Sequence, residues 1–107
     1  MSVIVHASSG PLSCEIRKIG DEGSVHLTGV ISSSAALTGN VRFLLAKSGP
    51  SGASNINQGN AFSLNAGAET YVSNVTINLR HGDHATVELV ATSGGGIACH
   101  AQAILKL

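Results

Sequence analysis

The chain has 107 residues, of which 43% are hydrophobic and 3% aromatic, and its six basic and six acidic side chains cancel at neutral pH. This length suits a single domain over residues 1–107 with its own core. The balanced charge argues against the strongly basic surface of a nucleic-acid-binding protein. Because no run of about 20 apolar residues is present, we expect no insertion into a membrane.

Apolar and polar residues alternate with a period of two along most of the chain, which predicts seven strands and no helix of useful length. Residues 1–10 precede the first of these strands and are expected to form a flexible N-terminal segment. The predicted strands cover, in chain order, residues 12–19, 24–32 and 40–47, a short stretch with Phe62 and Leu64, and residues 69–79, 84–92 and 97–105.

Residues 48–60 separate the third predicted strand from the fourth. They consist mostly of Gly, Ser and Asn, with one proline at Pro50. Residues of these types favour turns, so we expect a long mobile loop here. Short strands separated by turn signals at this spacing are typical of a β-sandwich.

The segment 79–85 joins two alternating runs and has the form Leu-x-x-x-Asp-x-Ala. In the run before it, Tyr71 shares the parity of the apolar residues that end at Leu79, so Tyr71 is expected to face inward. The corner resembles the one between strands E and F of immunoglobulin-like domains. That resemblance implies an all-β, seven-stranded immunoglobulin-like β-sandwich in which Leu79, Asp83 and Ala85 form a structural corner. Asp83 would accept hydrogen bonds from backbone N–H groups of the turn.

The two cysteines, Cys14 and Cys99, fall on the inward parity of the first and last predicted strands. In such a sandwich these strands can lie side by side. An even number of cysteines in a small all-β domain fits a structural disulfide in an oxidising compartment. Two buried free thiols fit the residues as well, and both interpretations stay open at this point.

The sequence offers little support for catalysis or for a metal site. His81 and His84 lie three residues apart, but no second pair of ligands accompanies them. The chain has no G-x-S-x-G elbow and no C-x-x-C pair. We therefore expect no enzymatic activity, no cofactor and no bound metal.

The outward residues of the third, sixth and seventh predicted strands mix charged, polar and apolar side chains. These three strands would be neighbours in an immunoglobulin-like arrangement. Their outer face would then be either an ordinary sheet surface with a few apolar residues or a contact surface for another chain. The candidate binding residues on this face are Arg42, Leu44, Glu88, Val90, Gln102 and Ile104.

The stretch from Asn40 to Ile97 is similar to a known protein family. It resembles the periplasmic curli-assembly chaperones, the CsgC and CsgH family. Because the chain has no Trp and has two cysteines far apart in the sequence, it looks more like the CsgH branch. The enterobacterial branch carries a C-x-C pair where this chain has residues 37–39, so no redox role is carried over. The similarity rests on Val41, Leu44, Ser51-Gly52 with Ser54, Gln58, Phe62-Ser63-Leu64, Ala66, Leu79 with Asp83, Val87 and Ser93-Gly94, and on Gly23-Ser24-Val25 in the second strand.

The resemblance implies a periplasmic chaperone that inhibits premature amyloid formation by curli subunits through weak, transient binding. Its clients would be disordered chains rich in Gly, Gln and Asn. We expect a monomer that needs no cofactor, and the periplasmic location favours a disulfide between Cys14 and Cys99. The alternative is an adhesion or pilus-associated immunoglobulin-like binding module without chaperone activity.

Overall fold

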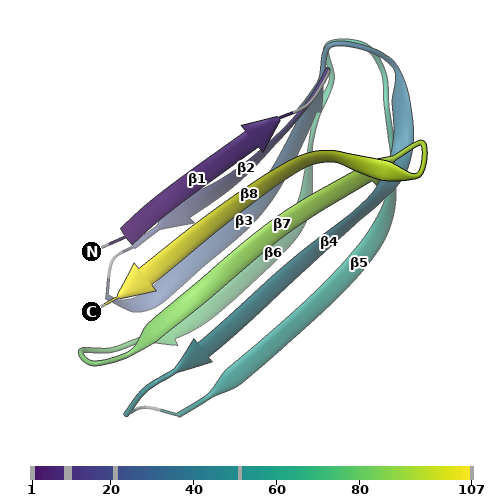
Figure 1. Cartoon of the computed structure of the whole chain (residues 1–107). Coiled ribbons are helices and arrows are strands. Elements are labelled where there is room, and N and C mark those ends of the chain that lie inside the picture. The colour runs from purple at the N-terminus through teal and green to yellow at the C-terminus, as the bar shows by residue number, and fades with distance from the viewer. Residues whose placement is uncertain (1, 9–10, 21, 51, 107) are drawn as a thin grey trace.

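The computed structural model describes residues 2–8, 11–20, 22–50 and 52–106, and within these ranges the chain forms eight strands (Figure 1). This part of the chain contains no helix, and so none long and apolar enough to cross a membrane. The strands are β1 (Ser2–Ser8), β2 (Leu12–Ile19), β3 (Gly23–Ser33), β4 (Leu37–Ser48), β5 (Ser54–Leu64), β6 (Glu69–Leu79), β7 (His84–Ser93) and β8 (Gly96–Lys106).

The strands form two antiparallel sheets that lie face to face (Figure 1). One sheet has five strands in the order β1-β8-β7-β4-β5, and the other has three in the order β2-β3-β6. Alternating apolar residues from both sheets fill the space between them, and on β7 and β8 many of these are alanines. The largest fully buried hydrophobic side chains are Leu12, Ile16, Leu27, Ile31, Phe43, Leu89 and Leu105.

The seven predicted strands are present as β2 to β8, but residues 2–8 do not form the flexible segment that we expected. They form β1, which pairs with β8 from Ser2 opposite Leu105 to Ser8 opposite Cys99. This pairing joins the two ends of the chain. The β-branched run Val3-Ile4-Val5 is typical of a strand, but a local pattern carries no information about pairing with the far end of the chain.

The prediction of a loop over residues 48–60 is also wrong, because β5 already begins at Ser54. It pairs with β4 without interruption, from Lys47 opposite Ser54 to Leu37 opposite Leu64. Most of β5 before Phe62 is exposed. An edge strand with polar residues on both faces shows no apolar alternation, so main-chain pairing forms a strand where composition indicated a loop.

Two β-bulges turn Tyr71 and Ile97 to the surface, although strict alternation along the sequence puts Tyr71 in phase with Leu79 and Ile97 in phase with Cys99, on the inward side. The register skips Val72 on β6 and Ala98 on β8. Each extra residue reverses the alternation beyond it. As a result, Tyr71 is 66% exposed and Ile97 is 68% exposed.

A disulfide joins Cys14 on β2 to Cys99 on β8, with 5.6 Å between the two Cα atoms. The expectation that the two strands lie side by side is wrong, because they belong to opposite sheets. The place beside β8 is taken by β1. The disulfide therefore ties one sheet to the other across the core.

The corner between β6 and β7 is built around a buried carboxylate. Asp83 is 1% exposed and accepts a hydrogen bond from the backbone N–H of Arg80 at 3.0 Å. The ammonium group of Lys47 on β4 lies 3.6 Å from the same carboxylate oxygen. Leu79 and Ala85, on either side of the corner, are part of the core. Asp83 thus fixes the passage of the chain from one sheet to the other.

Removing the disulfide by the double substitution Cys14→Ala/Cys99→Ala should destabilise the fold strongly. The bond spans a sequence separation of 85 residues, for which chain entropy gives an upper value of about 4–5 kcal/mol. We expect the melting temperature, followed by circular dichroism, to fall by more than about 10 °C. The exposed neighbour variant Ser13→Ala should melt like the wild type. Two titratable thiols per wild-type chain in denaturant without reductant would contradict the disulfide.

Asp83→Ala should lower the free energy of unfolding by about 3 kcal/mol, because it leaves the Lys47 ammonium buried without this counter-ion. Asp83→Asn keeps an oxygen that accepts the hydrogen bond from the Arg80 backbone N–H, so its free energy of unfolding should fall by less. Urea denaturation measures both, with Glu22→Ala on the exposed β2–β3 turn as the control. An Asp83→Ala midpoint equal to that of the control would show that the carboxylate does not hold the corner.

Candidate functional site

The outer face of the five-stranded sheet brings the six candidate binding residues together. We use "outer face" for the outward residues of β4, β7 and β8, whose pairing is antiparallel. Because neighbouring residues alternate between core and solvent, the register of these strands decides which side chains meet on this face. Its members from the sequence prediction are Arg42, Leu44, Glu88, Val90, Gln102 and Ile104.

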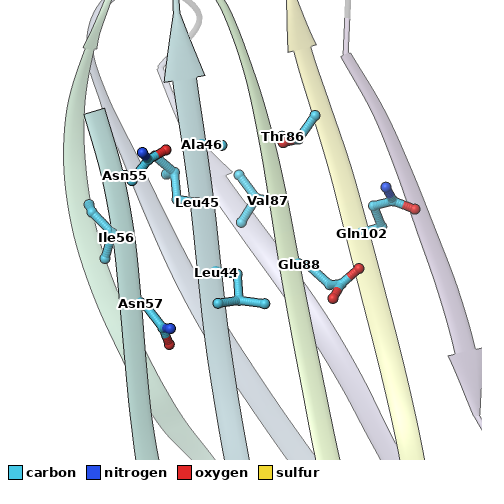
Figure 2. Close-up of a pocket in the computed structure, with 10 residues that line it drawn as sticks. All are labelled: Leu44, Leu45, Ala46, Asn55, Ile56, Asn57, Thr86, Val87, Glu88 and Gln102. Carbon is cyan, nitrogen blue, oxygen red and sulfur yellow. The ribbon is translucent and has the colours of Figure 1, made fainter. Parts of the chain in front are cut away.

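One row of side chains crosses four strands at the centre of this surface. Leu44 on β4 stands opposite Asn57 on β5 and Glu88 on β7, and Glu88 stands opposite Gln102 on β8. These four side chains line a groove of about 430 Å³, and Figure 2 shows how they lie around it. Leu44 is half-buried. This row of four residues thus brings an apolar side chain, two amides and a carboxylate to the groove.

A second hollow, of about 720 Å³, lies beside the groove around Arg42. Val90 stands opposite Arg42, and Ile97, turned outward by its bulge, also lines this hollow. Leu44 and Glu88 line both hollows, which therefore adjoin. Together they form one shallow surface along the strands.

The charged side chains on this surface differ in their contacts within the chain. Glu88 Oε2 lies 3.3 Å from His100 Nε2, so the carboxylate has a partner on the next strand. Arg42 is exposed, and among the described residues it has no salt-bridge partner. A guanidinium in this position can donate to a carbonyl or carboxylate of another molecule.

Over the ranges that the structure describes, no three His, Cys, Asp or Glu side chains lie close enough to hold a metal ion. Arg42, Leu44 and the amides offer hydrogen bonds and apolar contact. These are the components of a binding surface for another chain.

On the opposite face of the molecule, several charged side chains pair with one another. On the three-stranded sheet, Arg17 bonds to Glu15 at 2.7 Å and to Glu69 at 3.2 Å, and its guanidinium lies 5.8 Å from the centre of the Tyr71 ring. The hydrogen bond to Glu15 raises the pKa of Arg17 above its usual value. Val30 stands between Glu15 and Tyr71 in the register and is only 2% exposed. The guanidinium of Arg17 is thus paired within the chain, whereas that of Arg42 on the outer face has no salt-bridge partner among the described residues.

Sequence reasoning missed Asn55, Asn57 and Ile97 as members of the candidate surface. The two asparagines lie on β5, which was expected to be a loop, and Ile97 was placed in the core. A weak signal for β5 existed, because Ile56 shares the even numbering of Phe62 and Leu64 and packs against the core with them. No comparable signal marks the bulge beside Ile97.

A family model described as CsgH protein matches residues 13–102. The chain belongs to the CsgH family. The resemblance to the CsgC and CsgH family predicted from the sequence is thereby confirmed.

Two solved structures are similar to this CsgH-family chain. The solution structure of R. palustris CsgH has a TM-score of 0.64 and 26% identity, over 82% of this chain and 87% of that one. The E. coli curli protein CsgC has a TM-score of 0.68 and 19% identity, over 89% of this chain and 97% of that one, and shows a shared fold alone. The search of curated proteins found no match.

Proposed function

We propose that this chain is a periplasmic chaperone that inhibits premature amyloid formation by curli subunits through weak, transient binding. The observation that carries the proposal is the family match over residues 13–102. A structural neighbour described as a curli protein supports it at the level of fold. The buried disulfide favours an oxidising compartment such as the periplasm. The proposal also takes the sandwich to be immunoglobulin-like and the protein to act as a monomer.

The outer face is the surface that we assign to the client. Its two shallow hollows follow the direction of the strands, as an extended chain would. Leu44 and Val90 supply apolar contact, and Gln102 and Arg42 supply hydrogen-bond donors. A disordered client loses conformational entropy when it binds, so a surface of this kind gives low affinity and short-lived complexes.

Inhibition of this type needs neither turnover nor a cofactor. The chaperone has only to bind the client during the time in which the client would otherwise form the first ordered aggregate. The exposed Arg42 guanidinium adds attraction during encounter, because charge at a contact surface acts mainly on the rate of association.

Purified protein should lengthen the lag time of amyloid formation by a curli major subunit at ratios well below one to one. Transient binding lets one chaperone act on many client molecules in turn, which is why sub-stoichiometric amounts suffice. Thioflavin fluorescence measures the lag time. An unchanged lag at an equimolar ratio would overturn the chaperone proposal and favour an adhesion or pilus-associated binding module.

Arg42→Glu should weaken inhibition while leaving the fold intact, since the side chain is exposed and lies on the assigned surface. Arg80→Glu makes the same change of charge at an exposed site on the β6–β7 corner and serves as the matched control. Charge attraction is screened within about 8 Å at physiological ionic strength. Wild-type inhibition should therefore weaken as salt rises, and that of Arg42→Glu should change less. Normal inhibition by Arg42→Glu at low salt would exclude this surface.

A further inference from the structure

Strand β5 is a long and regular edge of the five-stranded sheet. Its single hydrogen-bonded neighbour in the described sheet is β4, and the register between them runs from Ser54 to Leu64 without a bulge. On an edge strand, every second residue directs its N–H and C=O groups away from the sheet. Main-chain groups along β5 are therefore available to a further strand.

The sequence of β5 lacks the features that usually prevent strand addition. Natural edges carry charged side chains, prolines or bulges that discourage pairing with other chains. The residues of β5, Ser-Asn-Ile-Asn-Gln-Gly-Asn-Ala-Phe-Ser-Leu, include no charge and no proline. By contrast, β2 carries Glu15, Arg17 and Lys18, and β6 carries Glu69 and a bulge at Val72.

The two halves of β5 have different surroundings. Gln58 accepts a hydrogen bond from the Ser73 hydroxyl, and the Asn60 amide donates to the carbonyl of Val72 at 3.4 Å, so this half leans on β6. Asn55 and Asn57, in the other half, border the 430 Å³ groove (Figure 2). The half that begins at Ser54 is thus continuous with the surface assigned to the client.

We propose that β5 accepts an additional strand, and that its occupant is an extended client segment without charges, built from Asn, Gln, Gly and Ser. Strand addition of this kind draws affinity from main-chain hydrogen bonds and specificity from alternate side chains. The assignment of a client rests on the proposed function.

The side chains of β5 select this chemistry. Asn55 and Asn57 are two residues apart and lie on the same side of the strand, where amide side chains of an added strand would stack beside them as a ladder. Gly59, next on that side, has no side chain to obstruct a partner. A charged residue beside Asn55 or Asn57 would lose hydration without meeting a counter-ion at those positions. While paired with β5, the client strand cannot offer the same edge to another client.

Hydrogen exchange followed by NMR tests the pairing directly. The probe is a capped peptide made only of Asn, Gln, Gly and Ser, added to the wild-type protein. We expect slower exchange at alternate amides of residues 54–60, by about tenfold at a peptide concentration of ten times its Kd. A peptide with Asp or Lys in place of Asn should give much less protection.

Substitutions at Asn57 separate pairing from charge attraction. Asn57→Lys and Asn57→Asp should both reduce protection by the peptide, because either charge guards the edge. With the peptides that carry Asp or Lys, charge attraction would instead make the two variants differ in opposite directions. Asn78→Lys and Asn78→Asp, at an exposed site on β6, are the matched controls, and the melting temperature of each variant shows whether it folds.

Three results would overturn the inference. The first is unchanged exchange along β5 with the peptide present, and the second is opposite effects of Asn57→Lys and Asn57→Asp. The third is protection of β5 that grows with protein concentration alone, since a second copy would then be the occupant. If the protein delays curli amyloid but β5 stays unprotected, only this inference fails. If β5 is protected but amyloid is not delayed, the proposed function fails and strand addition stands.

Discussion

The register that joins β4, β7 and β8 is the constraint on which the rest of the structure depends. Neighbouring residues on these strands point to opposite faces, so a slip by one residue would bring Arg42 into the core and expose Phe43. Phe43, Val87 and Leu89 are at most 1% exposed, and the cost of exposing them holds the register. The outer face, its two hollows and the position of β5 all follow from this single arrangement.

Two further contacts hold that register at the ends of the strands. The disulfide ties β8 to the opposite sheet through Cys14 and Cys99. Lys47, near the end of β4, reaches the buried Asp83 in the corner just before β7. Few aromatic side chains contribute to the core, and many inward residues of β7 and β8 are alanines. The stability of a fold with a core of this kind therefore depends strongly on the covalent link between the two sheets.

The sequence predicted the parts of the fold that come from local alternation. The strands with one buried face, the inward parity of Cys14 and Cys99 and the grouping of Arg42 with Leu44 all follow from a period of two. The missed parts come from distant or main-chain effects. The β5 strand exists because its backbone pairs with β4, and the bulges beside Tyr71 and Ile97 have no marker in composition. The family resemblance, and not the residues alone, connected this surface to curli.

The account places binding on one surface, formed by the outer face and the adjoining edge of β5, and leaves the three-stranded sheet uninvolved. Paramagnetic relaxation measures this most directly, with a spin-labelled curli subunit added to isotope-labelled protein. The account predicts signal loss at Arg42, Leu44, Val90 and residues 54–57, and none on the outward side of β2, β3 and β6. Signal loss centred on the three-stranded sheet around Arg17 would contradict it.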